Sequence, residues 1–234
     1  YELYTLEQSI LHRRYGGPLE HARLYLLLTA SACRHQWEHV LRQAVAGGVD
    51  LVQLREKELD DASLLDHARR VRALTRELGV PLIINDRPDI AALVDADGVH
   101  VGQNDLPPTA VRRLLGPDRW VGVSTHDLRQ LREAAVTADY VGLGPCFNSA
   151  TKSFARLAGL DFVRAAADLV SLPAFAIGGI GPDNVEAVLA AGARRIAVSS
   201  ALCAADDPQA VARRLRCAID AAVHRDQARC TDRH

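Results

Sequence analysis

Two carboxylates follow two strand-like runs that lie one helix apart in the sequence. The apolar run 82–84 stops at Asn85-Asp86, and the run 98–102 stops shortly before Asp105. The connection between the runs is about long enough for one helix, so they should be parallel neighbours that end at the same edge of a sheet. Strands lie roughly 4.8 Å apart, which would bring Asp86 and Asp105 close together. Two such carboxylates favour a proton or a cation between them, and with oxygen ligands alone the expected cation is Mg²⁺.

A simpler interpretation gives each aspartate a role in helix initiation. Pro88 and Pro107 both mark the start of a helix, and a carboxylate near a helix N-terminus is favoured by the helix dipole. The same placement at two successive strand ends favours the metal pair over this alternative.

A second polar cluster follows an earlier strand-like run. In a strand the period of two places Gln53, Arg55 and Lys57 on one face. An amide and two cations on one face suit a diphosphate, because arginine supplies a bidentate fork and lysine a mobile point charge. Lys57 and Lys152 are the two lysines among 28 basic residues, which makes both candidates for a compact charge. The alternative is a solvated Arg-Glu-Lys turn, with lysines left on the surface by chance.

Hydroxyl groups stand at a further strand end and in a long loop. Ser124, Thr125 and His126 follow the run 120–123, although helix capping would also explain Ser124 or Thr125. The loop 145–159 is longer than an ordinary connection and carries Ser149, Thr151 and Lys152, so we expect a binding loop or a lid. Cys146 should be unreactive because the local sequence supplies no base to activate its thiol.

The last two strand-like runs end in residues that suit a phosphate. Gly178-Gly179 follow one run and Ser199-Ser200 follow the next, and each pair leads toward a helix. Glycine allows a phosphate to approach the backbone closely, and helix N-termini offer free N–H groups. The strand ends thus predict two anion sites, one rich in cations and one built from backbone.

The elements that position these residues alternate regularly from Leu24 onward. Eight strand-like runs alternate with helical segments, which predicts an α/β fold with a parallel sheet and right-handed crossovers. Eight strands can close into a (β/α)8 TIM barrel, whose reacting groups lie at the carboxyl ends of the strands. An open doubly wound sheet is the rival, but no GxGxxG follows the first strand. The clearest helices are expected over 36–46, 61–78 and 182–191, and from about 127 and 208.

Length and composition bound the remaining choices. At 234 residues and 48% hydrophobic content, one barrel domain over residues 23–224 is expected. Residues 1–22 are interpreted as a tail or linker and residues 225–234 as a disordered C-terminal tail. The chain contains no methionine, so we interpret it as a fragment whose upstream part is missing.

Charge and cysteine content argue against several classes of protein. The net charge of −1 gives no overall basic field for nucleic acid or membrane surfaces. There is no apolar run long enough for a membrane span and no signal-peptide pattern, so a cytoplasmic location is expected. The five cysteines are widely spaced without a CxxC, which argues against a disulfide framework or a zinc site. A homo-oligomer remains compatible with the sequence.

Seven motifs together resemble the thiamine phosphate synthase family, and their order and spacing match from about Leu24 to Ala221. They are QLREK, INDR, GVHVGQND, GVSTH, GPCFNSATK, IGGI and VSSA. The resemblance implies a TIM barrel that joins 4-amino-2-methyl-5-hydroxymethylpyrimidine diphosphate to a thiazole phosphate, releasing pyrophosphate with Mg²⁺. It implies that the pyrimidine diphosphate is held by Gln53, Arg55, Lys57, Asn85, Ser124 and Lys152, and the metal by Asp86 and Asp105. It also implies that the thiazole phosphate is surrounded by Ser149, Thr151, Gly178, Ser199 and Ser200.

The family pattern also implies a mechanism in which Arg55, Lys57, Ser124 and Lys152 are catalytic. Diphosphate departure and attack by the thiazole nitrogen need positioning and electrostatic stabilisation more than proton transfer. The sequence departs from the family in the long loop, where Asn148-Ser149 replace Pro-Thr and Ser153-Phe154 follow the lysine. Two alternatives stay open: a related thiazole tautomerase with a histidine at the place of His126, and a non-enzymatic sensor of phosphorylated ligands.

Overall fold

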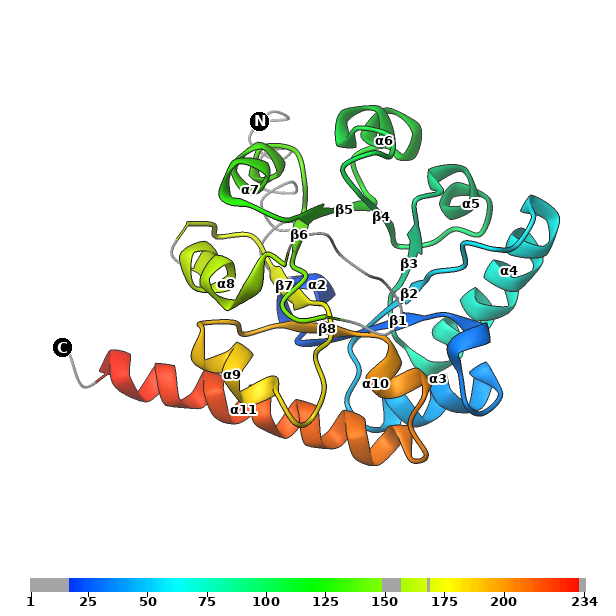
Figure 1. The fold of residues 1–234 in the computed structure, drawn as a ribbon. Helices are drawn as coiled ribbons and strands as arrows, with labels where there is room; N and C mark the ends of the chain where they lie inside the picture. The colour runs from blue at the N-terminus through cyan, green and yellow to red at the C-terminus, as the bar shows by residue number, and fades with distance from the viewer. Residues whose placement is uncertain (1–16, 149–156, 168, 232–234) are drawn as a thin grey trace, which may run out of the picture.

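The protein is a closed barrel of eight parallel strands, as the sequence predicted. The structure, a computed structural model, describes residues 17–148, 157–167 and 169–231. Each strand pairs with its sequence neighbours, and the last strand pairs with the first, so the sheet has no free edge (Figure 1). The strands are β1 Leu24–Leu28, β2 Leu51–Leu54, β3 Leu82–Asn85, β4 Gly98–Val101, β5 Trp120–Thr125, β6 Tyr140–Leu143, β7 Ala174–Ile177 and β8 Ile196–Val198.

Helices surround the barrel and cover the outer face of the sheet (Figure 1). The crossover helices are α3 Trp37–Ala46, α4 Asp61–Leu78, α5 Pro88–Leu93, α6 Pro108–Leu115, α7 Leu128–Ala135, α8 Gly159–Ala167 and α9 Val185–Ala190. The remaining helical elements are α2 Pro18–His21, η1 Ala30–Ala32, α10 Ser200–Cys203 and α11 Pro208–Thr231. Alternating strands and helices thus produce the predicted architecture, with the carboxyl ends of all strands at one rim.

Local signals explain most helix ends. The Asp60 carboxylate accepts a hydrogen bond from the Ser63 backbone N–H at 2.9 Å at the start of α4, and Gly79 ends that helix with φ 69°. α9 begins at Val185, later than the predicted 182, because Asn184 forms a turn before it. The Asn184 side-chain oxygen accepts from the Gly181 N–H at 2.9 Å, and its amide donates to the Gly179 carbonyl at 2.8 Å.

The barrel interior is filled by three aromatic rings. Tyr25, Tyr140 and Phe175 are fully buried and pack edge to face, with centroids 5.2 Å apart for Tyr25–Phe175 and 5.8 Å apart for Tyr140–Phe175. Gly122 makes room for them, since a Cβ at that position would lie 2.1 Å from the Tyr140 ring. These rings form the floor beneath the carboxyl ends of the strands.

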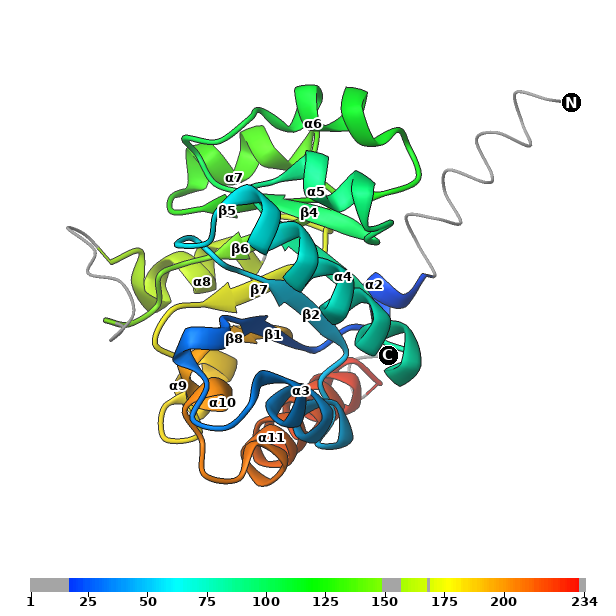
Figure 2. The same ribbon diagram turned by 90° about the vertical axis from the view of Figure 1, so that its right-hand side faces the viewer.

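Both predicted chain boundaries differ from the structure. Figure 2 shows α2 at the end of the barrel where the strands begin, and there Leu19 and Ala22 are buried in the same cluster as Tyr25. Residues 17–22 therefore belong to the barrel, although the sequence placed them in a tail. α11 continues to Thr231 instead of giving way to disorder at residue 225, because no glycine or proline interrupts residues 209–231. Within the described residues, no helix is long and apolar enough to cross a membrane.

Candidate active site

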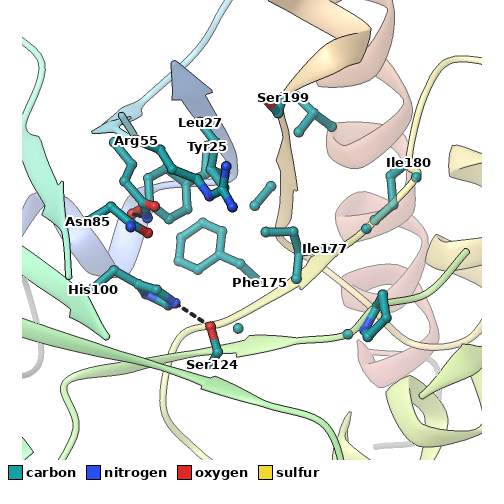
Figure 3. Close-up of a pocket in the computed structure, with 18 of the residues that line it drawn as sticks. Tyr25, Leu27, Arg55, Asn85, His100, Ser124, Phe175, Ile177, Ile180 and Ser199 are labelled. Atoms are coloured by element: carbon teal, nitrogen blue, oxygen red, sulfur yellow. Dashed lines mark hydrogen bonds between the residues drawn. The ribbon is translucent and has the colours of Figure 1, made fainter. Parts of the chain in front are cut away.

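A cavity of about 170 Å³ opens at the carboxyl ends of the strands. Figure 3 shows Arg55 and Asn85 on one side of it and Ile177 and Ile180 on the other. Seven of the predicted site residues line this cavity together with the barrel floor. They are Gln53, Arg55, Asn85, Ser124, Gly178, Ser199 and Ser200. The rule that parallel strands present their ends at one rim therefore located these residues correctly.

Arg55 is held at the rim through its backbone. The Arg55 N–H donates to the Leu28 carbonyl at 2.8 Å, and the Thr29 hydroxyl donates to the Arg55 carbonyl at 2.7 Å. The neighbouring Glu56 turns away, with only 6% of its side chain exposed and one oxygen accepting from the Ala30 N–H at 2.6 Å. Glu56 is therefore not solvated, as the alternative interpretation would require, whereas the Lys57 side chain is 48% exposed. The guanidinium remains beside the cavity as its one arginine among the described residues.

Lys57 and Asp86 form an ion pair outside the cavity wall. The Lys57 ammonium lies 3.0 Å from Asp86 Oδ2, and the two side chains are 48% and 25% exposed. Asp86 has a φ of 61°, a conformation that is uncommon for residues other than glycine and that occurs at functional turns. One of the two lysines thus stands next to one of the two predicted metal ligands.

Asp105 stabilises the turn that follows β4. Its Oδ2 accepts a hydrogen bond from the Gly102 N–H at 2.7 Å. β3 and β4 are parallel neighbours as predicted, and the Asp86 N–H donates to the His100 carbonyl at 2.8 Å. Neither aspartate caps a helix, since α5 and α6 begin after Arg87 and Pro107 without a side-chain cap. Neither carboxylate therefore acts as a side-chain cap of the helix that follows it.

The two aspartates suit Mg²⁺ by donor type. Over the described ranges, no group of three or more His, Cys, Asp or Glu side chains is arranged to hold a metal ion. Mg²⁺ needs fewer protein ligands than that, because it commonly binds one or two carboxylates and completes its shell with water and phosphate oxygens. Asp86 and Asp105 follow adjacent strands and offer carboxylate oxygens, so they match this requirement by number and type of ligand.

A buried chain of hydrogen bonds below the cavity was not foreseen from the sequence. Gln53 Nε2 donates to the Tyr25 hydroxyl at 2.6 Å, and that hydroxyl lies 3.0 Å from the Tyr140 hydroxyl. The Tyr140 hydroxyl lies 3.2 Å from His100 Nδ1, and His100 Nε2 lies 2.9 Å from Ser124 Oγ. Figure 3 shows this last contact as a dashed line. The available signal was a histidine inside the apolar run 98–102 and a tyrosine inside two other runs.

His100 stays neutral in this environment. Burial lowers the pKa of its imidazole to about 4, and the charge of Asp105 opposes that shift only partly. Burial likewise raises the pKa of Tyr25 and Tyr140 above their ordinary values. The hydrogen-bonded residues from Gln53 to Ser124 are therefore all uncharged near neutral pH. A low-dielectric interior tolerates polar groups in this neutral, hydrogen-bonded form.

The opposite side of the cavity is shaped by two glycines with positive φ. Gly178 has φ 100°, and a Cβ there would lie 2.7 Å from the Pro145 Cβ. A Cβ on Gly179 would lie 2.4 Å from the Asn148 carbonyl oxygen. The segment after β6 thus packs directly on the segment after β7, and the Phe147 N–H donates to the Gly178 carbonyl at 3.0 Å. The glycines serve this backbone contact as well as leaving room at the cavity.

Several predicted residues lie outside the described part of the chain or next to the site. Ser149, Thr151 and Lys152 fall in residues 149–156, which are outside the described residues. Cys146 is buried, and burial raises its thiol pKa to about 11, as expected for an unreactive cysteine. Thr125 donates to the Gly142 carbonyl at 2.9 Å, and α7 is capped by Asp127, so neither Ser124 nor Thr125 caps that helix.

His126 lines the cavity but is held by the backbone. Its Nδ1 lies 2.6 Å from the Gly144 carbonyl oxygen, so Nδ1 carries the hydrogen, and Nε2 makes no hydrogen bond to a described residue. The imidazole is thus oriented, which is the feature that a proton-transfer enzyme would need.

Comparison with known proteins identifies one family for this chain. A family model described as thiamine monophosphate synthase matches residues 24–202. A thiamine-phosphate synthase from Chloroflexus aurantiacus is 46% identical over 200 residues, which are 84% of this chain and 92% of that protein. A second, from Rhodopirellula baltica, is 45% identical over 79% of this chain, but the chain spans only 51% of that protein. The solved thiamine phosphate pyrophosphorylase from Pyrococcus furiosus superposes with a TM-score of 0.80 at 31% identity, covering 88% of this chain and 99% of that one.

Proposed function

Because the chain belongs to the thiamine monophosphate synthase family, we propose that its barrel mouth makes thiamine phosphate from two phosphorylated substrates. It would couple 4-amino-2-methyl-5-hydroxymethylpyrimidine diphosphate to 4-methyl-5-(2-hydroxyethyl)thiazole phosphate, or to the carboxylated thiazole, and release pyrophosphate. The observation that carries this proposal is the division of one cavity into two unlike sides. Gln53, Arg55, Asn85 and Ser124 supply polar side chains on one side, and the Gly178 turn with Ser199 and Ser200 supplies the other.

The cationic side would absorb the charge of the departing diphosphate. Arg55 offers a planar fork to two phosphate oxygens, and Lys57 offers a compact ammonium at the adjacent rim. The ion pair between Lys57 and Asp86 at 3.0 Å holds that ammonium near the place where the diphosphate would leave. Lys152 would contribute a further positive charge from the long loop. Charge that develops on the leaving group is thereby met by groups already in position.

Mg²⁺ would be held by Asp86 and Asp105 and would neutralise part of the diphosphate charge when bound. The contacts of these two aspartates support that role, and no further protein ligand is needed. Asp86 keeps Lys57 in place, and Asp105 fixes the turn after β4 through the Gly102 N–H. Both carboxylates are thus positioned by contacts that leave other oxygen lone pairs free.

The glycine and serine side would anchor the thiazole phosphate. Gly178 and Gly179 adopt positive φ and bring backbone to the cavity surface, while Ser199 and Ser200 follow β8 on the same side. Ser149 and Thr151 would complete this anchor from the long loop. A phosphate fixed there would point the thiazole nitrogen at the pyrimidine methylene, so that positioning supplies much of the rate.

Ser124 and His100 do not form a nucleophile and base despite their distance of 2.9 Å. The third group of a hydrolytic triad would be a carboxylate on His100 Nδ1, but that nitrogen meets the Tyr140 hydroxyl. A pKa of about 4 also makes His100 a weak base at neutral pH. This chemistry supports diphosphate departure and transfer over acyl-enzyme hydrolysis.

Incubation of the purified chain with both substrates and Mg²⁺, followed by chromatography for thiamine phosphate and a pyrophosphate assay, tests the proposal. Product should require both substrates and should appear in step with pyrophosphate. Arg55→Ala should reduce formation strongly, and Arg129→Ala, which removes an exposed arginine of α7, should leave it unchanged. Tight binding of both substrates without any product would favour a ligand sensor instead.

A further inference from the structure

The hydrogen-bond chain beneath the cavity has a direction. It runs through Gln53, Tyr25, Tyr140, His100 and Ser124, which come from β2, β1, β6, β4 and β5. Gln53 and Ser124 stand at its two ends, and all five residues line the cavity. The inner members contact one another across the barrel, so the state of one end constrains the other.

The amide of Gln53 sets the direction. Its Nε2 can only donate, so the Tyr25 hydroxyl must accept and must direct its own single hydrogen to Tyr140. Tyr140 then donates to His100 Nδ1, which is therefore the unprotonated nitrogen. The opposite order would leave the Tyr25 hydroxyl hydrogen without an acceptor in a fully buried site, which is costly.

The two ends of the chain consequently present opposite polarity to the cavity. His100 Nε2 carries the ring hydrogen and donates to Ser124 Oγ, so the serine hydrogen is free to donate elsewhere. At the other end, Gln53 Oε1 is buried and has no hydrogen-bond partner among the described residues, and Gln53 as a whole is only 1% exposed. A buried acceptor without a partner is unusual in a folded protein and points to a ligand that supplies a donor.

We propose that Tyr25, Tyr140 and His100 are positioning residues that fix Gln53 Oε1 as an acceptor and the Ser124 hydroxyl as a donor for an aminopyrimidine. The inference rests on the proposed function, because it concerns the pyrimidine half of that reaction. A 4-aminopyrimidine has the complementary polarity, since its amine offers hydrogens and its ring nitrogens offer lone pairs. The 4-oxo counterpart has the reverse pattern, with an acceptor at the exocyclic atom and a hydrogen on the adjacent ring nitrogen.

The fixed acceptor also suits the proposed bond cleavage. As diphosphate departs, positive charge on the pyrimidine methylene is shared with the exocyclic amine, whose hydrogens become stronger donors. A preoriented Gln53 oxygen would stabilise this charge more than it stabilises the neutral substrate.

A first experiment determines the direction of the hydrogen bonds from the position of the His100 hydrogen, without enzyme turnover. In the full chain labelled with ¹⁵N-histidine, the signals lost in His100→Gln identify His100 in the NMR spectrum. The imidazole should be neutral near pH 7, with its hydrogen on Nε2. A hydrogen on Nδ1 would make His100 the donor to Tyr140 and the acceptor from Ser124, and would overturn the proposal.

A second experiment compares kcat/KM for the 4-amino substrate and its 4-oxo counterpart. The wild-type chain should prefer the amine by about 10²-fold or more, because the oxo analogue leaves both ends of the chain facing groups of the wrong polarity. Tyr25→Phe frees the Gln53 amide to rotate, so this preference should fall by roughly tenfold or more. Tyr140→Phe interrupts the chain one step further along and should reduce the preference in the same direction.

The control is Thr75→Val, which removes another fully buried hydroxyl, one that donates to the Arg72 carbonyl at 3.1 Å. It should leave the preference unchanged. A purely structural role of the tyrosines would lower kcat/KM for both substrates alike, and an unchanged ratio in folded Tyr25→Phe and Tyr140→Phe would overturn the inference. Absence of coupling by the wild-type chain would instead refute the proposed function, and calorimetric binding of the two pyrimidines would then measure the same ratio.

Discussion

The two sides of the barrel mouth differ in which groups form their surface, side chains on one side and backbone on the other. On the side of β2 to β5, side chains carry the polar groups, and a chain of hydrogen bonds through the barrel interior orients two of them. On the side of β7 and β8, backbone with positive φ at Gly178 and Gly179 forms the surface. The first side recognises a ligand by donors, acceptors and charge, and the second by the space that missing side chains leave. Substitutions should therefore change chemistry on the first side and shape on the second.

The largest effect is expected at Asp105. Asp105→Asn should reduce Mg²⁺-dependent coupling by about 10³-fold, because an amide is a poor ligand for a hard cation that balances the leaving group. The side-chain oxygen of asparagine can still accept from the Gly102 N–H, so the turn and the barrel should persist. Thiamine phosphate formation across a Mg²⁺ titration and circular dichroism measure the two outcomes.

The matched comparison for Asp105→Asn is His126→Ala, since His126 also borders the mouth but is bound to the Gly144 carbonyl. The histidine variant should lose much less coupling. If it were inactive while Asp105→Asn stayed active, the tautomerase interpretation would replace the synthase.

The buried side-chain network should also appear in the pH dependence of stability. The pKa of His100 is lowered to about 4 in the folded protein, against about 6.5 in an unfolded chain. Between pH 4 and pH 6.5 the unfolded state therefore binds a proton at this residue and the folded state does not. The stability that is present above pH 6.5 is lost as the pH falls toward 4. The loss attributable to this residue should be about 3 kcal/mol.

Urea unfolding at several pH values measures this loss. The wild-type free energy of unfolding should decline more steeply between about pH 6.5 and 4 than that of His100→Gln, whose side chain does not titrate. His39→Gln, which removes an exposed histidine, should follow the wild-type curve. Parallel curves for wild type and His100→Gln would mean that His100 is not held in the neutral form.

A smaller effect is expected when the lysine at the cationic rim is replaced by arginine. Lys57→Arg keeps the charge beside Asp86, but a planar guanidinium cannot follow a departing diphosphate as a compact ammonium can. We expect kcat to fall by roughly 10²-fold with the fold intact. Arg69→Lys, a change between the same two residue types at an exposed position of α4, is the control. Wild-type turnover in Lys57→Arg would remove the special role of lysine here.

The two sides of the mouth also differ in how far sequence could predict them. Gln53, Arg55, Asn85 and Ser124 were located correctly because the period of two and the common rim of parallel strands fix their place. The contact from Tyr25 to Tyr140 could not be located in this way, since it joins β1 to β6 across the barrel and depends on the register of a closed sheet. The pairing of Lys57 with Asp86 likewise depends on side-chain conformation after the strands have ended.

Chain ends and short turns were predicted less well for a related reason. The burial of Leu19 depends on the open lower end of the barrel, which no local pattern in residues 17–22 reveals. The late start of α9 depends on the Asn184 side chain satisfying the Gly181 N–H before the helix begins. The brief α10 after Ser199 was missed because four residues give no periodic signal.

The smallest effect is expected on the backbone side, where it should fall on one substrate only. Gly178→Ala places a Cβ 2.7 Å from the Pro145 Cβ in a backbone conformation with φ 100°, so the turn must shift. The KM for the thiazole phosphate should rise by about tenfold, while that for the pyrimidine diphosphate should change little. Gly181→Ala is the matched control, because its Cβ would meet only the Ala201 Cβ at 3.8 Å. Equal increases in both KM values for Gly178→Ala would show that the two sides act as one site and would remove the division between side-chain and backbone recognition.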